Sequence, residues 1–214
     1  MKVLVVGGGG REHAILQRLS ESSQISKLYC APGNGGIAAL AECVPLQATE
    51  VDAIAAWAEQ NGIGYVVVGP DDPLCLGLVD KLRQRGIPAF GPTQAAARIE
   101  GSKVFAKKLM RRYGIPTAAC EIFCDAELAL RYTRIAPLPM VVKADGLALG
   151  KGVVICHTRA EAEEAVRDMM ERGKFGASGS RVVVEEFLEG PEVSVLAFTD
   201  GVSLKWLAPG MDHK

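Results

Sequence analysis

The sequence predicts a doubly wound parallel α/β domain, followed by a second domain of the α+β class. Up to about residue 90, short apolar runs alternate with segments whose apolar residues recur at helical spacing, as in a parallel sheet covered by helices. After Gly91-Pro92 strands follow strands more directly, which favours antiparallel pairing. At 214 residues the chain exceeds one average domain. We therefore expect one domain at residues 1–92 and another at 93–214.

Elements of the first domain follow from apolar runs bounded by turn residues. Continuous runs such as Val3–Val6 are typical of strands buried on both faces, and Gly or Pro ends several of them. Strands are expected at residues 3–6, 28–30, 65–68 and 87–90, and helices at residues 11–22, 51–58 and 74–85.

Elements of the second domain are assigned in the same way. Apolar residues at helical spacing predict helices at residues 94–100, 103–113 and 159–172. Strands are expected at residues 140–143, 153–155, 182–184 and 193–198. The first two of these strands flank a glycine-rich loop.

Composition excludes several classes of protein. Twenty-four basic against 25 acidic side chains leave a net charge of −1, whereas nucleic-acid-binding domains are usually basic. No apolar run reaches the ~20 residues that a bilayer helix requires. The apolar run at the start of the chain is too short for a signal peptide. Without export we expect a cytoplasmic protein with reduced thiols. Because the cysteines form no C-x-x-C pair and have no His at ligand spacing, we expect no zinc site.

The first glycine-rich segment, Gly7–Gly10, lies between a predicted strand and a predicted helix. Backbone N–H groups at such a helix start favour a phosphate or another anion. The dinucleotide pattern G-x-G-x-x-G fits poorly, because Glu12 takes the third glycine's place. No acid ends the second strand to hold a ribose, where residues 31–34 read APGN.

The second glycine-rich segment, residues 142–153, reads VKADGLALGKGV and differs from a Walker A loop in its spacing. A strand rather than a helix follows it. A loop of this kind, with Lys143 in the strand before it and Lys151 within it, can close over the phosphates of a nucleotide. Lys143 ends a run expected to be buried, where an unpaired charge is costly.

A third segment completes a candidate nucleotide pocket. After the strand at 182–184, residues 185–188 read EEFL, and exposed backbone groups at such a strand end can hydrogen-bond the edge of a purine. Glu192 can accept hydrogen bonds from ribose hydroxyls.

These segments together resemble the ATP-grasp enzymes, and among them the phosphoribosylamine–glycine ligase family. The resemblance runs along the whole chain in the family's order. It rests on GGGGREHA (7–14), APGNGG (31–36), VVVGPDDPL (66–74), GPT…EGSKVFAKKLM (91–110), VKADGLALGKGV (142–153), VEEFLEGPEVS (184–194) and DHK (212–214). It implies an ATP-grasp fold for the second domain.

The resemblance also implies roles for individual residues. The family's ATP-binding positions correspond to Lys103, Lys143, Gly150, Lys151, Gly152, Glu185, Glu186, Phe187, Leu188 and Glu192. The lysines would contact phosphates, residues 185–188 the adenine, and Glu192 the ribose. The positions facing phosphoribosylamine correspond to Gly8, Gly9, Gly10, Asn34, Asp71, Asp212, His213 and Lys214.

The implied reaction joins glycine to 5-phosphoribosylamine in purine biosynthesis. ATP would phosphorylate the glycine carboxylate, and the amine would attack the glycyl phosphate to give glycinamide ribonucleotide, ADP and phosphate. Such a site needs cations on the transferred phosphoryl group more than a side-chain nucleophile, and no catalytic residue is assigned. The partners are then small molecules (ATP, glycine and phosphoribosylamine), with neither nucleic acid nor membrane.

The sequence departs from the family pattern at three places. Asp71 stands where the family usually has Glu, and Met211 where it usually has Gln. Family members also continue past the position of Lys214 with the residues that hold magnesium or manganese. We therefore expect the metal ligands beyond the chain end, a truncated ATP-grasp domain, and no turnover by this chain alone.

Other functions stay open at this point. Another ATP-grasp ligase, such as a biotin-carboxylase-like or formate-using purine enzyme, would share the lysine loop but not GGGGREHA or DHK. A nicotinamide-dependent oxidoreductase would use the first glycine turn, and a non-catalytic module would only bind the nucleotide.

Overall fold

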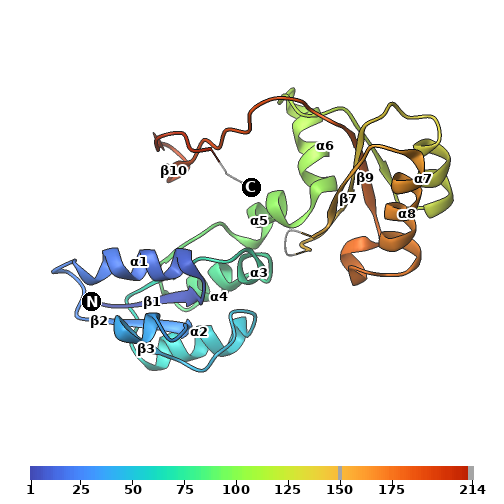
Figure 1. Ribbon diagram of the computed structural model, residues 1–214. Helices are drawn as coiled ribbons and strands as arrows, with labels where there is room; N and C mark the ends of the chain where they lie inside the picture. The colour runs from blue at the N-terminus through green and yellow to red at the C-terminus, as the bar shows by residue number, and fades with distance from the viewer. Residues whose placement is uncertain (149–150, 212–214) are drawn as a thin grey trace.

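The computed structural model describes residues 1–148 and 151–211, which form two lobes with a sheet each (Figure 1). The first lobe contains a five-stranded sheet of order β3-β2-β1-β4-β5 in which every pairing is parallel. Its strands are β1 (Lys2–Gly7), β2 (Lys27–Pro32), β3 (Glu42–Cys43), β4 (Tyr65–Val68) and β5 (Ala89–Phe90). Its helices are α1 (Gly10–Ser20), η1 (Ile37–Ala39), α2 (Val51–Gln60), α3 (Asp71–Cys75) and α4 (Leu78–Gln84).

Both faces of the parallel sheet are covered, as doubly wound folds require. Along β1, Val3 and Val5 pack with Leu16 of α1, whereas Leu4 and Val6 belong to the larger cluster formed with α2 and α4. This alternation follows from the two-residue period of a strand. It explains why apolar runs without polar interruption predicted these strands.

Strand order determines where a ligand can bind in this lobe. The chain runs from β1 outward to β2 and β3, and then returns to the other side of β1 for β4 and β5. The order therefore reverses between β1 and β4, and open α/β sheets bind ligands at the carboxyl ends of the strands flanking that point. The Gly7–Gly10 turn follows β1, and Gly69 to Asp71 follow β4.

The second lobe contains an antiparallel sheet of order β6-β9-β7-β8. Its strands are β6 (Cys120–Phe123), β7 (Met140–Ala144), β8 (Val153–Cys156) and β9 (Val182–Glu186). One face packs against α7 (Ala126–Thr133), α8 (Arg159–Val166) and the π-helical η2 (Arg167–Glu171), with the short η3 (Gly176–Gly179) beside them. The other face packs against α6 (Lys103–Tyr113) through Val104 and Val183. Helix α5 (Gln94–Gly101) packs on α3 and precedes α6.

Several expected elements differ from the observed ones. The single helix expected at 74–85 is two helices, because Gly77 adopts a left-handed conformation with φ of +84° between α3 and α4. The helix expected at 159–172 changes to π-helical geometry at Arg167. The strand expected at 193–198 was wrong for residues 193–196, since regular pairing begins only at Ala197. Strands β3 and β6 and helix α7 were not expected.

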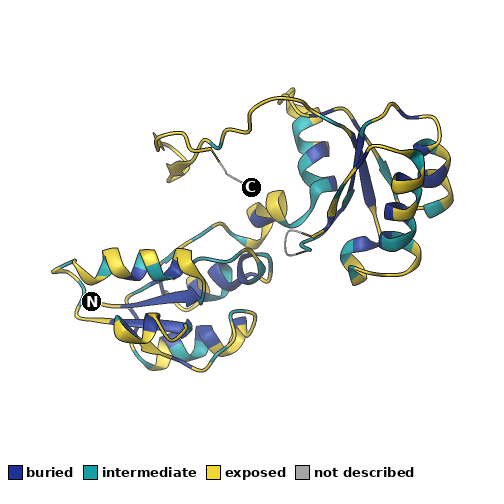
Figure 2. Ribbon diagram, in the orientation of Figure 1, coloured by how far each residue is buried: buried dark blue, intermediate teal, exposed yellow. Residues whose placement is uncertain are grey.

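Residues 193–211 form an extended arm with little burial (Figure 2). Within it, β10 (Ala197–Thr199) and β11 (Leu204–Trp206) pair as an antiparallel hairpin, and Ser194 bridges to Gly210. The Phe198 ring lies against Phe90 of β5, with ring centroids 5.8 Å apart, so the arm contacts the first lobe. Among the described residues, no helix is long and apolar enough to cross a membrane.

Candidate functional site

The glycine turn after β1 is built around a buried carboxylate. Glu12, in the first turn of α1, is only 4% exposed, and its Oε2 accepts a hydrogen bond of 2.6 Å from the Gly9 N–H. The Glu12 side chain fills the space beside Gly7, where a Cβ atom would lie 2.6 Å from its Cγ, and it would also overlap a Cβ on Gly69. The protein's own carboxylate thus takes one N–H group of the predicted anion site. Gly10 has open space around it.

Asn34 links the loop after β2 to this turn. Its Nδ2 donates to the Gly8 carbonyl at 2.8 Å, while its Oδ1 accepts from the N–H groups of Gly36 and Ile37 at 2.8 and 2.9 Å. The amide is therefore used inside the protein. In this structure Asn34 positions the glycine turn, and its expected contact with a substrate stays a prediction.

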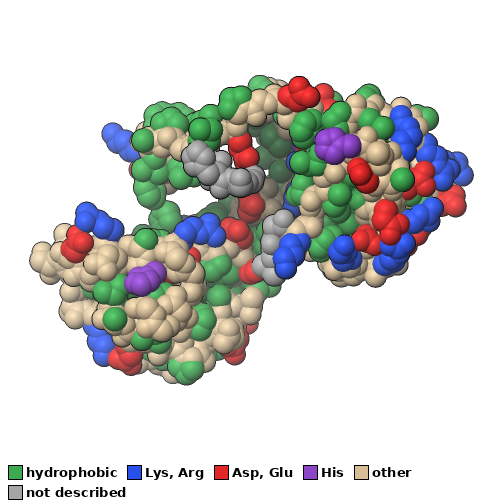
Figure 3. Space-filling model, viewed as in Figure 1, with side chains coloured by type: hydrophobic (Ala, Val, Ile, Leu, Met, Phe, Trp, Pro, Cys, Tyr) green, Lys and Arg blue, Asp and Glu red, His purple; other side chains and the backbone are tan. Residues whose placement is uncertain are grey.

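A cavity of about 570 Å³ separates the glycine turn from the second glycine-rich segment, and we call it the interlobe cavity. Asp71, the first residue of α3, lines it from the first lobe beside Arg11, whereas Lys103 and Leu147 line it from the second. Figure 3 shows a hollow between the two lobes on this face. Among the described residues, its lining is Arg11, Pro70, Asp71, Asp72, Glu100, Lys103, Leu147, Ala148 and Val153.

A second cavity, of about 420 Å³, lies within the second lobe between α6 and the sheet, and we call it the lysine cavity. The Lys143 Nζ lies 2.7 Å from Oε2 of Glu185, a carboxylate that is 5% exposed. The Lys103 Nζ donates to the Gly146 carbonyl at 3.2 Å. The lining is Ile99, Glu100, Lys103, Ala106, Lys107, Met110, Thr117, Ala118, Lys143, Glu185 and Leu188.

Charges in the lysine cavity leave a positive excess. Among the described residues, its lining contains the ammonium groups of Lys103, Lys107 and Lys143 and the carboxylates of Glu100 and Glu185, so three of their charges are positive and two are negative. An anionic ligand would balance the excess. The pairing with Glu185 also explains how Lys143 can end a buried strand run without an uncompensated charge.

The segment at the end of β9 is divided between two cavities. Glu185 and Leu188 line the lysine cavity, whereas Glu186 and Phe187 line a separate cavity of about 600 Å³ that Glu185 also borders. The Glu186 carboxylate accepts from the Ala119 N–H at 2.8 Å. The structure therefore brings together only part of the predicted 185–188 set.

The remaining predicted residues lie apart from these cavities or outside the described residues. Lys151 is exposed, and Gly152 is buried with its carbonyl accepting from the Ala144 N–H at 2.8 Å. Glu192 is exposed in the segment after β9. Gly150, Asp212, His213 and Lys214 lie outside the described residues.

Comparison with known families settles which fold this arrangement belongs to. Residues 1–100 match the family model for the phosphoribosylglycinamide synthetase N domain, and residues 101–214 match that for its ATP-grasp (A) domain. The chain belongs to the phosphoribosylglycinamide synthetase family. The predicted α/β fold with an ATP-grasp second domain is confirmed.

Relatives in the phosphoribosylglycinamide synthetase family are similar along the whole chain. It is 49% identical over 216 residues to a phosphoribosylamine–glycine ligase of Allochromatium vinosum, matching 100% of this chain and 50% of the relative. It is 51% identical to the trifunctional purine biosynthetic protein adenosine-3 of Drosophila melanogaster, of which it covers 16%. The chain spans about half the length of most of the curated relatives it matches.

Solved structures show the same similarity. The crystal structure of phosphoribosylamine–glycine ligase from Thermotoga maritima matches with a TM-score of 0.80 and 31% identity, over 98% of this chain and 49% of that one. The biotin carboxylase of Campylobacter jejuni, solved as a β,γ-ATP complex, matches with a TM-score of 0.77 and 17% identity, over 96% of this chain and 49% of that one. At that identity the second match shows the fold alone.

Two buried residues of this family member were not found by sequence reasoning. Lys107 of α6 is 6% exposed and lies 3.4 Å from Oε1 of Glu185. Asp145 is 5% exposed and accepts at Oδ1 from the Ser102 hydroxyl and the Val104 N–H, both at 2.8 Å. The four-residue spacing from Lys103 to Lys107 places both lysines on one helix face, a signal that could have found Lys107.

The cysteines near these sites are poor nucleophiles. Burial raises the pKa of the Cys30 thiol to about 12, and its Sγ donates to the Gly7 carbonyl at 3.2 Å. Burial also raises the pKa of Cys120, which borders the same cavity as Phe187. Because thiolates are the reactive form, neither thiol is activated at neutral pH.

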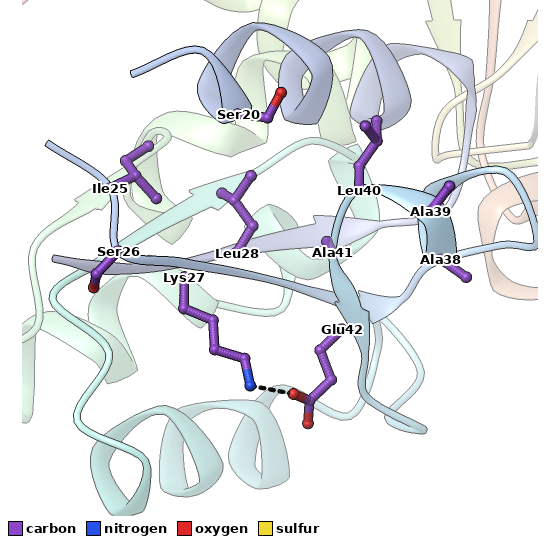
Figure 4. A pocket seen from close by; sticks show the side chains of 10 residues that line it. All are labelled: Ser20, Ile25, Ser26, Lys27, Leu28, Ala38, Ala39, Leu40, Ala41 and Glu42. Atoms are coloured by element: carbon purple, nitrogen blue, oxygen red, sulfur yellow. Dashed lines mark ion pairs between the residues drawn. The ribbon is translucent and has the colours of Figure 1, made fainter. Parts of the chain in front are cut away.

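In the part of the chain that the structure describes, neither a metal-binding cluster nor the pocket beside β2 adds to the candidate site. Across residues 1–148 and 151–211, no group of three or more His, Cys, Asp or Glu residues gathers as a metal site. A pocket of about 510 Å³ lies at the amino ends of β2 and β3, where Lys27 and Glu42 form an ion pair of 2.5 Å (Figure 4). Neither glycine-rich segment lines it, so it is separate from the candidate site.

Proposed function

We propose that this chain supplies the ATP-binding and amine-binding parts of a phosphoribosylamine–glycine ligase. The reaction would ligate glycine to 5-phosphoribosylamine through glycyl phosphate, giving glycinamide ribonucleotide, ADP and phosphate. The observation that carries the proposal is the lysine cavity, which the ammonium groups of Lys103, Lys107 and Lys143 line and in which the last two pair with the buried Glu185 carboxylate. Membership of the phosphoribosylglycinamide synthetase family supports it.

The proposal gives the lysine cavity the role of holding ATP. Lys103 and Lys143 would contact the phosphates from the cavity wall, with Gly150, Lys151 and Gly152 closing over them from the loop. Preorganised positive charge stabilises a phosphoryl group in transfer and makes a side-chain nucleophile unnecessary. The adenine would lie along Glu185, Glu186, Phe187 and Leu188, with Glu192 at the ribose. The proposal assigns the magnesium or manganese ion no ligand among the described residues.

The interlobe cavity would hold phosphoribosylamine. The carboxylate of Asp71 and the guanidinium of Arg11 both line it, and they suit an amine and a phosphate respectively. The turn after β1 would contribute Gly8, Gly9 and Gly10, the loop after β2 would contribute Asn34, and the end of the chain would contribute Asp212, His213 and Lys214.

We place the domain boundary near residue 92, between β5 and α5.

We further propose that the protein acts in the cytoplasm on small molecules only. All six cysteines are free thiols, which supports a reducing compartment.

We also propose that the 214-residue chain does not turn over alone, since it spans about half the length of its relatives. Glycine-dependent ADP formation by the purified chain would contradict this second point.

Thermal unfolding of the chain with ADP, with NAD and without ligand tests the nucleotide assignment. ADP at 100 times its dissociation constant adds about 2.7 kcal/mol to the free energy of unfolding, so the Tm should rise by a few degrees. Lys143→Met should reduce the rise, whereas Lys174→Met, at an exposed ion pair of the same lobe, should not. Stabilisation by NAD alone, or an equal ADP response in both variants, would contradict the proposal.

A further inference from the structure

Lys107 is a buried cation to which the proposed function assigns no role. It lies in the middle of α6 and is 6% exposed, whereas the neighbouring Lys108 is exposed. Its Nζ donates to the Thr117 hydroxyl at 2.7 Å and to the Ala118 carbonyl at 3.0 Å. It also lies 3.4 Å from Oε1 of Glu185. Two hydrogen bonds and one ion pair therefore hold the buried Lys107 ammonium in place.

Glu185 therefore has two cationic partners that differ in access to the cavity. The Lys107 side chain is 7% exposed and contacts Oε1, whereas the Lys143 side chain is 27% exposed and contacts Oε2 at 2.7 Å. Lys143 is the one that can turn toward a ligand in the lysine cavity. If it did so in the absence of Lys107, the buried Glu185 carboxylate would keep no ion-pair partner among the described residues, which is strongly unfavourable.

We propose that Lys107 is a positioning residue that neutralises Glu185 so that Lys143 can leave this carboxylate and bind the phosphates of a nucleotide. The inference rests on the proposed function, because it takes the ligand of the lysine cavity to be a nucleoside polyphosphate. Lys107 itself stays with Glu185, Thr117 and Ala118 throughout. It acts on the ligand only through Glu185 and Lys143.

This role of Lys107 affects only ligands that carry phosphate groups. ADP draws Lys143 away from Glu185, whereas adenosine has no phosphate to do so. A purely structural role for Lys107 would weaken the binding of both ligands alike. The ratio of ADP to adenosine affinity therefore separates the two roles.

The experiment is calorimetric titration of the 214-residue chain with ADP and with adenosine. Lys107→Met should weaken ADP binding about tenfold or more, because an unpaired buried carboxylate is costly, and should change adenosine binding by no more than about threefold. Lys108→Met is the matched control on the same helix and should leave both affinities unchanged. Lys107→Gln removes the charge but keeps a hydrogen-bond donor, and it replaces Lys107→Met if circular dichroism shows that variant to be unfolded.

A double variant tests the route through Glu185. In a Glu185→Gln background there is no carboxylate charge left to neutralise, so adding Lys107→Met should change ADP affinity by less than about twofold. A tenfold loss that persists in this background would overturn the inference, as would equal losses for ADP and adenosine or an unchanged ADP affinity in Lys107→Met. Absence of ADP binding by the unchanged chain would instead overturn the proposed function, and this inference with it.

Discussion

At the scale of single residues, Glu12 sets the requirement for glycine at several positions around it. Its carboxylate accepts from the Gly9 N–H, and its side chain occupies the space that a Cβ on Gly7 or Gly69 would need. Gly7 also has a φ of +126°, which L side chains rarely adopt. The glycine-rich sequence thus serves a buried acid as well as any ligand, which a phosphate-binding motif alone does not predict.

Replacing Glu12 should reveal this role as a loss of stability. Glu12→Ala leaves the Gly9 N–H without its acceptor in a half-buried place, so we expect the free energy of unfolding to fall by about 1–3 kcal/mol. Glu12→Gln keeps an acceptor oxygen and should cost less. Urea denaturation measures both changes.

The matched control is Glu21→Ala at the other end of α1, where the carboxylate pairs with Arg18 on the surface. An exposed pair of this kind contributes about 0–1 kcal/mol. Equal losses of unfolding free energy in Glu12→Ala and Glu21→Ala would show that the buried contact of Glu12 with Gly9 does not stabilise the protein.

At the scale of elements, Asp145 connects three segments of the second lobe. It follows β7 and accepts from Ser102 and Val104 at the start of α6, and it pairs with Arg181 just before β9 at 2.5 Å. Its backbone carbonyl also accepts from the Lys103 N–H at 3.0 Å. The orientation of the helix that carries Lys103 and Lys107 therefore depends on one carboxylate.

Removing this carboxylate should destabilise the second lobe. Asp145→Ala leaves buried donors at the start of α6 unpaired, and we expect a loss of about 2–4 kcal/mol in urea denaturation. Asp125→Ala removes the exposed N-cap of α7, where the side chain accepts from the Leu128 N–H, and should cost about 1 kcal/mol. A loss in Asp145→Ala no larger than in Asp125→Ala would contradict this role.

The sequence predicted those elements whose burial leaves an unambiguous pattern. Strands β1, β4 and β9 contain apolar runs rich in valine because helices cover both faces of their sheets. Strand β3 is two exposed residues at a sheet edge, and its formation depends on pairing with β2 rather than on its own composition. The break at Gly77 was missed because the apolar spacing of Leu74 and Leu78 continues across it.

The candidate site was predictable to a similar degree. Lys103, Lys143 and Glu185 were found because they belong to recognisable segments, and the structure places all three around one cavity. Lys107 and Asp145 were missed because their burial depends on how α6 packs against the sheet. Local sequence cannot report such packing, since a lysine on a helix is usually exposed.

At the scale of the whole molecule, the arm at residues 193–211 is a distinct region. It holds several exposed apolar side chains, including Val202 at 96% and Trp206 at 70% exposure. The contact of Phe198 with Phe90 joins it to the first lobe. A cavity of about 670 Å³ borders this contact.

Loss of that contact should free the arm. An aromatic pair contributes about 0.5–1.5 kcal/mol, so Phe198→Ala should increase the rate of tryptic cleavage after Lys205 by roughly two- to tenfold. Mass spectrometry of timed digests measures the rate. Val202→Ala at the exposed hairpin turn should leave it unchanged. Equal rates in the two variants would show that Phe198 does not restrain the hairpin.

Glu100 and Lys103 line both the lysine cavity and the interlobe cavity, so one acid and one base form a shared wall between them. A ligand that draws the Lys103 ammonium to its own side alters the field felt by an occupant of the other side. Such an effect is reciprocal for binding, because whatever factor the first ligand applies to the second, the second applies to the first. Ligands bound in the two cavities would therefore be thermodynamically linked through the two side chains that both cavities share.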